Sequence, residues 1–282
     1  MNEWSRMAPA KINITLDVLG LRPDGFHEVE MIMQTVELAD RLSLDPGYRG
    51  GELLLTTDHP ELTAGTDNLV LRAARALRLE SGCNGGAKFH LEKRIPLAAG
   101  LAGGSADAAA ALHLLNRYWD LNWPLSRLQE LGGSLGSDIP FCLLGGTALA
   151  TGRGEQVRPL PALTQFSLLL VKPDFGVSTP EVYQAFDRQD MTGPVYASRK
   201  FLTERGSSPA SWFHNDLEPV TCLLYPQVQW LLQEVRNLGG TAVMSGSGPT
   251  VMGIFPDEEK LRRAAGELSV RYRDTFITRI RG

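Results

Sequence analysis

The chain has few cysteines and no pattern that would join them. Of its 282 residues only three are cysteine, at positions 83, 142 and 222, and no two of them form a C-x-x-C pair. An odd number without such a pair argues against a disulfide framework and against a structural zinc site. Each cysteine is therefore expected to be a small core or surface residue rather than a nucleophile, and the protein is expected to work in the reducing cytoplasm.

Long apolar runs and long basic runs are also missing. No stretch approaches the roughly 20 apolar residues of a membrane-spanning helix, and the N-terminus lacks the apolar region of a signal peptide. The net charge is −4, and a chain of this balance without a basic tract disfavours nucleic acid as the main partner. We therefore expect a soluble, intracellular protein with neither membrane nor nucleic acid as partner.

The sequence motifs of several common enzyme classes are absent as well. The chain contains no G-x-x-x-x-G-K-[ST], no H-E-x-x-H, and no G-x-G-x-x-G or G-x-S-x-G after an expected strand, since the G-x-S-x-G at residues 132–136 lies at the end of an expected helix. These absences exclude a P-loop, a dinucleotide fold, a hydrolase nucleophile elbow and a zinc protease. Its length allows a sizeable core and is one at which a single domain commonly becomes two.

A glycine loop between a strand and a helix is the most distinctive feature that the chain does have. Ala87–Glu92 reads as a strand, and Pro96–Ser105 leads through glycines into an alanine-rich helix expected to begin at Ala106. Glycine lets the backbone approach a bound group closely, and a helix N-terminus attracts phosphate. Ser105 is placed as the N-cap. By composition alone the loop is equally well a tight strand-to-helix turn.

Three further groups carry polar side chains that chemistry could use. Lys11 and Asn13 share one face of an alternating strand from Ala8 to Leu19, although that face could equally be a solvated outer surface. The turn from Gly20 to Glu28 delivers Phe26 and His27 together, as a grip on a flat heterocycle or as a hairpin with a partly buried aromatic. Asp138 follows a Gly/Ser turn, where an aspartate is most often an N-cap.

The remaining elements suggest an α+β protein. Asp67 or Asn68 is expected to cap a helix, Ser126 and Gln129 to form a capping box, and Asp257 to cap the last helix. The Gly- and Pro-rich residues 153–161 are the expected boundary, giving domains 1–157 and 158–282. Residues 189–211 are expected to be a surface excursion. The second half follows a β-α-α-β-β-α-β order, which predicts helices on an antiparallel sheet.

Three separated motifs together resemble those of the GHMP kinases, the family of galactokinase, homoserine kinase and mevalonate kinase. They are Pro9–Asn13, the phosphate loop Pro96–Ser105 and the glycine-rich Ser245–Thr250. The resemblance implies a two-domain fold, with an N-terminal ribosomal-S5-like α/β domain and a C-terminal ferredoxin-like α+β domain. It also implies a kinase, a phosphotransferase with an alcohol group as acceptor.

Further sequence segments resemble those of one branch of that family, which acts in the non-mevalonate route to isopentenyl diphosphate. They are residues 10–13 with 20–28, then 67–69, 135–141 and 215–218. The substrate implied is a cytidyl diphosphate sugar alcohol, phosphorylated on its 2-hydroxyl. A kinase of the homoserine or mevalonate type is the alternative, although those substrates have no flat base for Phe26 and His27. A non-catalytic nucleotide-binding module is a further alternative.

The resemblance assigns roles to particular residues. Asp138 takes the proton from the substrate hydroxyl, while Lys11 stabilises charge and keeps the carboxylate ionised. The residues implied in substrate binding are Asn13, Phe26, His27, Asp138 and Thr179. The residues implied in ATP binding are Lys93, Pro96, Leu97, Ala98, Ala99, Gly100, Leu101, Ala102, Gly103, Gly104, Ser105 and Ala106.

ATP and Mg²⁺ are the implied co-substrate and cofactor, with Ser105 as a candidate ligand for the metal and no other metal-binding residue indicated. The protein is expected to be a monomer or a weak homodimer. Two departures from the family pattern stand out. Ala98 and Ala99 occupy positions where glycine is common, so the loop is expected to be less flexible. Phe26 stands where tyrosine is frequent, so either the tyrosine hydroxyl is not required or a water substitutes for it.

Overall fold

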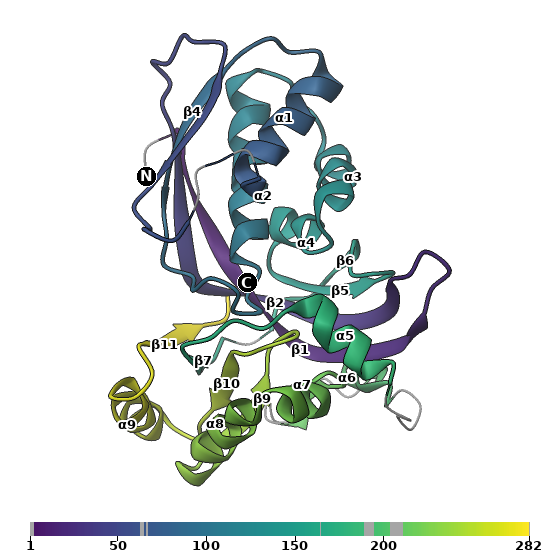
Figure 1. Ribbon diagram of the computed structural model, residues 1–282, viewed down its shortest axis with the longest axis vertical. Helices are drawn as coiled ribbons and strands as arrows, with labels where there is room; N and C mark the ends of the chain where they lie inside the picture. The colour runs from purple at the N-terminus through teal and green to yellow at the C-terminus, as the bar shows by residue number, and fades with distance from the viewer. Residues whose placement is uncertain are drawn as a thin grey trace. The chain divides into compact units, whose positions relative to one another are not determined.

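The chain forms two compact units in a computed structural model that describes residues 3–62, 65, 67–163, 165–188, 195–203 and 211–281 (Figure 1). The first unit comprises residues 1–10, 38–95 and 102–145, and the second comprises 11–37, 96–101 and 146–282. Two long strands, β1 (Ser5–Leu21) and β2 (His27–Leu44), each run from one unit into the other. The predicted boundary at residue 157 stays a prediction.

The first unit combines strands with a helical layer. Strand β3 (Leu53–Thr57) runs parallel to β4 (Ala87–Glu92), and β4 pairs antiparallel with the end of β2. Beside these strands lie α1 (Leu69–Ser81), α2 (Gly103–Tyr118), α3 (Leu125–Leu135) and α4 (Ile139–Leu144) (Figure 1).

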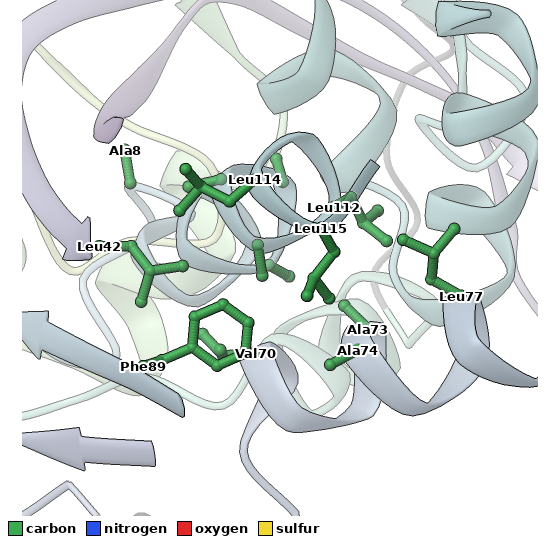
Figure 2. Packing of buried hydrophobic residues seen from close by; sticks show 14 of the residues in the cluster. Ala8, Leu42, Val70, Ala73, Ala74, Leu77, Phe89, Leu112, Leu114 and Leu115 are labelled. Carbon is green, nitrogen blue, oxygen red and sulfur yellow. The ribbon is translucent and has the colours of Figure 1, made fainter. Parts of the chain in front are cut away.

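Close packing of α1 and α2 builds the core of the first unit. Phe89 of β4 points from the sheet toward Val70 of α1, with Leu115 of α2 nearby (Figure 2). Ala73 and Ala74 are fully buried, and their small side chains let the two helix backbones approach. Burying one leucine or phenylalanine contributes roughly 1.5–3 kcal/mol. The packing of α1 against the alanine-rich α2 therefore holds α2 in place, and α2 carries the end of the glycine loop.

The second unit contains the antiparallel sheet that the sequence predicts. Its strands lie in the order β11-β7-β10-β9, and all their pairings are antiparallel. Chain order runs β7, helices, β9, β10, helix, β11, as expected from the periodicity. The bounds of these elements are β7 (Ser167–Lys172), α7 (Glu218–Leu224), α8 (Pro226–Asn237), β9 (Thr241–Met244), β10 (Val251–Ile254), α9 (Glu258–Ser269) and β11 (Asp274–Arg279).

Shorter elements complete the second unit. Strand β5 (Thr147–Thr151) pairs antiparallel with β2 and with β6 (Gln156–Leu160), and β8 (His214–Asn215) pairs parallel with β1. Helices α5 (Thr179–Phe186) and α6 (Ala197–Thr203) follow β7. Of the predicted excursion at 189–211, only 195–203 and 211 are described, and α6 makes part of it helical. No helix among the described residues is long and apolar enough to span a bilayer.

Helix caps confirm two predictions and contradict two. Asn68 accepts a hydrogen bond from the Val70 amide at 2.9 Å, and Asp257 caps α9. Helix α2, however, begins at Gly103 with Ala102 at the N-cap, so Ser105 is not the cap. The predicted capping box is also wrong, because Pro124 stands at the N-cap of α3 without a side-chain bond and Gln129 bonds the Pro140 carbonyl.

The polar face of β1 is buried, which excludes the solvated surface considered from the sequence. Asp17 is fully buried, and its carboxylate accepts the amides of Ala197 and Ser198 at the start of α6, both at 2.8 Å. Thr15 lies 2.6 Å from the Ser198 hydroxyl. The Asp17 carboxylate and the Thr15 hydroxyl therefore each have a partner from another part of the second unit, as burial requires.

Candidate functional site

Lys11 and Asn13 form a buried pair on β1. The Lys11 Nζ donates to Asn13 Oδ1 at 2.8 Å, and the two side chains are 5% and 1% exposed. Residues two apart in a strand point to the same face, so the alternation in the sequence predicts this pairing. A buried ammonium keeps its charge only where polar or anionic groups surround it. This pair thus provides a fixed positive charge in the second unit.

The glycine loop packs directly against the glycine-rich motif 245–250 within the second unit. Gly100 has φ +73°, and a Cβ there would lie 2.5 Å from the Ser245 carbonyl oxygen and 2.8 Å from that of Gly248. The Lys11 amide donates to the Leu101 carbonyl at 3.1 Å. Only glycine allows this backbone contact, which ties the loop to both other motifs.

Motif 245–250 is held in turn by Asn215. Its Nδ2 donates to the Met244 and Gly246 carbonyls, both at 2.8 Å. A Cβ on Gly246 would lie 3.2 Å from the Gly100 carbonyl oxygen and 3.4 Å from Lys11 Nζ. Three motifs far apart in the chain therefore meet around one ammonium group.

A buried trio in the first unit anchors both ends of the loop. Lys93 Nζ donates to Asp40, and to Asp107 Oδ2 at 2.8 Å, and its side chain is 2% exposed. Asp40 Oδ1 also accepts the amides of Arg94 at 2.6 Å and Ile95 at 2.8 Å, just before the loop. Asp107 lies in the first part of α2, just after it. One ammonium thus joins the residues on either side of the loop.

Burial and charge perturb the trio in a definite direction. Burial, with the Asp40 charge adding to it, raises the pKa of Asp107 to about 7, against the opposing effect of Lys93. Burial alone would lower the pKa of Lys93, but the two carboxylates outweigh it and raise that pKa. Asp107 Oδ1 is buried and accepts no hydrogen bond among the described residues. When both carboxylates are ionised, the trio of Asp40, Lys93 and Asp107 carries a net charge of −1.

Two alanines of the loop adopt the backbone conformation that usually requires glycine. Ala98 has φ +48° and Ala102 has φ +56°, in the left-handed region that costs an L-residue roughly 1–2 kcal/mol. A Cβ on Gly176 would lie 2.7 Å from that of Ala98, so Gly176 leaves room for it. Of the two departures from glycine noted in the sequence, Ala98 therefore stores strain in the loop, whereas Ala99 does not have a positive φ.

Asp138 stands at the N-cap position of α4 in the first unit. Its side chain makes no capping hydrogen bond, so the cap alone does not account for an aspartate here. The carboxylate is half-buried. Lys11 belongs to the second unit, and the pairing of Lys11 with Asp138 stays a prediction.

The turn that carries Phe26 is braced by charge pairs. Arg22 bonds Asp24 and donates to Glu28 at 2.6 Å, while Gly25 takes φ +83°. The Phe26 ring is 50% exposed, with the Arg153 guanidinium 4.9 Å from its centre. An exposed ring on a braced turn is available for stacking.

His27 is enclosed by residues of α5 and the residue that follows it. Its Nε2 lies 2.6 Å from Asp187 Oδ1, Tyr183 stacks on the ring at 4.7 Å, and Phe186 meets it edge-on at 6.3 Å. Sequence reasoning missed Tyr183 and Asp187. Their four-residue spacing places them on one helix face, but nothing in the sequence indicates which strand that face contacts.

Thr179, at the start of α5, is exposed and shares a hydrogen bond of 2.7 Å with the Ser247 hydroxyl. This bond brings a predicted substrate residue to the glycine-rich motif within the second unit. The sequence also missed Asp40 and Asp107, which neutralise Lys93 in the first unit.

Comparison with known proteins gives a consistent result. The model of the GHMP kinases N terminal domain matches residues 68–146, and that of the GHMP kinases C terminal matches residues 201–274. These ranges lie on either side of the predicted domain boundary. A crystal structure of 4-(cytidine 5'-diphospho)-2C-methyl-D-erythritol kinase superposes with a TM-score of 0.80 at 36% identity, covering 99% of each chain. Mevalonate kinase from L. major, with a TM-score of 0.72 at 14% identity, shares the fold alone.

Curated relatives are closer in sequence. The 4-diphosphocytidyl-2-C-methyl-D-erythritol kinase of Pelotomaculum thermopropionicum is 48% identical over 276 residues, covering 95% of this chain and 93% of the relative. That of Bacillus pumilus is 44% identical, covering 91% and 89%. The chain therefore belongs to the GHMP kinases, within the family of 4-diphosphocytidyl-2-C-methyl-D-erythritol kinases.

Proposed function

We propose that the protein transfers the γ-phosphoryl group of ATP to the 2-hydroxyl of 4-diphosphocytidyl-2-C-methyl-D-erythritol. The products are the 2-phosphate and ADP, in the non-mevalonate route to isopentenyl diphosphate. Besides the relatives' names, the observation that carries the proposal is the meeting of Lys11, Gly100 and Gly246 in the second unit. The cytoplasm is the proposed place of action, and a monomer or weak homodimer the proposed state.

The glycine loop is the proposed site for the triphosphate. Helix α2 begins within it at Gly103, and its first amides have no partner inside the helix. These amides and the positive end of the helix dipole favour an anion. The Lys93 ammonium already bonds two carboxylates, so its proposed contribution is to hold residues 94, 95 and 107 in position around the phosphates.

Mg²⁺ is the proposed metal, and it would come with the nucleotide. Asp40 and Asp107, on either side of the loop, both bond Lys93 and so are not offered to a second cation. Mg²⁺ commonly keeps several waters and binds mainly through substrate phosphates. The Ser105 hydroxyl is the candidate protein ligand. The ion would neutralise phosphate charge.

The proposed chemistry uses Asp138 and Lys11. Asp138 takes the proton of the substrate 2-hydroxyl as that oxygen attacks the γ-phosphorus, and the bond to the leaving ADP oxygen breaks. Lys11 holds positive charge near the transferring group, with its ammonium oriented by Asn13 at 2.8 Å. Phosphoryl transfer depends mainly on positioning and electrostatic stabilisation. A modest base is therefore sufficient.

The cytidyl group distinguishes this substrate from those of other GHMP kinases. We assign the base to the exposed Phe26 ring, for stacking, and to His27, for hydrogen bonding. Asn13 and Thr179 are assigned to the sugar alcohol. A kinase of the homoserine or mevalonate type remains the alternative function, but neither of those substrates has a flat base for this turn.

Initial rates with the cytidyl substrate, mevalonate and homoserine test the proposal directly. The cytidyl substrate is expected to give the highest kcat/KM, and a preference for either of the others overturns the assignment. Asp138→Asn is expected to abolish turnover while ATP binding, measured by calorimetry, changes little. Unchanged turnover in that variant rejects Asp138 as the base.

A further inference from the structure

The His27 ring has a fixed orientation because three residues from one helical segment contact it. Tyr183 stacks at an interplanar angle of 28°, and Phe186 meets the ring at 89°. Asp187 bonds Nε2 at 2.6 Å. The histidine side chain is 8% exposed, whereas that of Asp187 is 41% exposed. Stacking fixes the plane of the ring, and the carboxylate determines which nitrogen points toward it.

The bond to Asp187 also fixes where the ring proton lies. An ionised carboxylate only accepts hydrogen bonds, so Nε2 must carry the hydrogen. In a neutral imidazole the other nitrogen then has a lone pair. Nδ1 is therefore a hydrogen-bond acceptor for as long as the contact with Asp187 persists.

We propose that Asp187 is a positioning residue that makes His27 select cytosine over uracil. The inference rests on the proposed function, because it assigns the base to His27. Cytosine carries an amino group at the ring position where uracil carries a carbonyl oxygen. An acceptor at Nδ1 pairs with the amino group, whereas it faces the uracil oxygen with two opposed lone pairs. A lost and unreplaced hydrogen bond of this kind corresponds to roughly ten- to a hundredfold in affinity.

Asp187→Asn is the informative variant because it replaces a group that only accepts hydrogen bonds by one that can accept or donate, with little change in shape. An asparagine can accept from Nε2, as the carboxylate does, or turn its amide and donate to Nε2. In the second arrangement the hydrogen moves to Nδ1, which then donates to a uracil oxygen. The variant should therefore bind both bases, whereas Asp187→Glu retains an acceptor-only group.

Calorimetric titration with cytidine diphosphate and uridine diphosphate measures the effect without turnover. The titrations are made at about pH 8.5, on the alkaline side of the ordinary histidine range. Wild type is expected to prefer the cytidine nucleotide by about tenfold or more. In Asp187→Asn the ratio should fall to within about threefold, with a gain in uridine diphosphate affinity. Glu181→Gln removes a carboxylate from the same helix, one that bonds Tyr225 instead, and should keep the wild-type ratio.

Each result decides between the alternatives. Asp187→Glu should retain the preference for cytidine diphosphate even where both affinities fall. An Asp187→Asn protein that loses affinity for both nucleotides equally, with the ratio preserved, has a structural defect only, and the proposal is then wrong. Turnover of the cytidyl substrate by wild type, measured in parallel, separates a failure of the Asp187 role from a failure of the proposed function. If wild type turns over this substrate but Asp187→Asn leaves the affinity ratio unaltered, only the role of Asp187 is rejected. If wild type shows neither turnover nor a preference for cytidine diphosphate, the proposed function is rejected as well.

Discussion

Replacing Asp107 by asparagine should change the stability of the protein, relative to wild type, more favourably at neutral pH than in acid. The carboxyl is buried with a second carboxylate, and its pKa is raised from 3.8 to about 7. An unfolded chain loses this proton near pH 4, whereas the folded protein keeps it until about pH 7. The folded state therefore binds the extra proton over this window, and stability falls as pH rises through it.

The size of the effect follows from the difference in pKa. A pKa raised by about three units corresponds to roughly 4 kcal/mol of unfolding free energy, at about 1.4 kcal/mol per pH unit. This contribution is fully present below about pH 4 and is lost by about pH 7. The asparagine side chain of the variant cannot ionise, so the variant lacks this loss. The cost of burying the amide does not depend on pH and cancels when the slopes are compared.

Urea unfolding of wild type and Asp107→Asn across about pH 4 to about pH 8 measures this difference. Trp119 and Trp123 lie in the first unit and report on it by fluorescence. The free-energy difference between the two proteins should change by roughly 4 kcal/mol over the range and level off above about pH 7. Parallel curves for the two proteins would falsify the assignment of a raised pKa to Asp107.

Asp40→Asn is the matched control, because it makes the same chemical change at the other carboxylate. Asp40 Oδ1 accepts two backbone amides while its other oxygen accepts from Lys93. An amide in its place turns an NH₂ group toward the ammonium, so two donors face each other. We expect a loss of roughly 3 kcal/mol or more, since breaking a buried charge pair is costly. The two substitutions should thus act in opposite directions at neutral pH.

Three further predictions follow from other contacts. Gly100→Ala should lower ATP affinity about tenfold or more, because its Cβ overlaps the Ser245 carbonyl oxygen at 2.5 Å; unchanged binding by calorimetry would contradict this close packing. Ala98→Gly should raise unfolding free energy by roughly 0.5–1 kcal/mol by relieving its positive φ, and a lower urea midpoint would show that strain does not dominate. The hydrogen bond to Asp216 raises the pKa of His214, so His214 stabilises the fold fully below about pH 6.5 and loses this effect as pH rises through the raised value; His214→Gln should therefore have a flatter stability curve above that pH.

Local pattern was sufficient for much of the fold and for the motif residues. The alternation around Lys11 and Asn13 predicts their common face, and the 2.8 Å bond confirms it. The β-α-α-β-β-α-β order likewise predicts the antiparallel sheet of the second unit. Period-two and helical patterns are properties of neighbouring residues, which a sequence displays directly.

Residues that act through tertiary contact could not be found in this way. Asp40 lies 53 positions from Lys93, and Asp187 lies 160 from His27. An isolated aspartate in a strand or on a helix face does not indicate its partner. The cap at Ser105 was wrong for a related reason. Gly103 fits against Ile95, where a Cβ would lie 3.1 Å from that side chain, and this packing lets α2 begin three residues earlier than the start expected at Ala106.

The passage of the chain between its two units has a consequence for dividing the protein. Residues 11–37 and 96–101 precede position 157 but belong with 146–282. A fragment ending at 157 would carry β1 without its parallel partner β8 and Gly100 without the carbonyls of residues 245 and 248. Neither half is thus a self-sufficient module for expression or for fusion to another protein. Two separately made halves should recover ordered structure only on mixing, with the missing strand and loop supplied in trans.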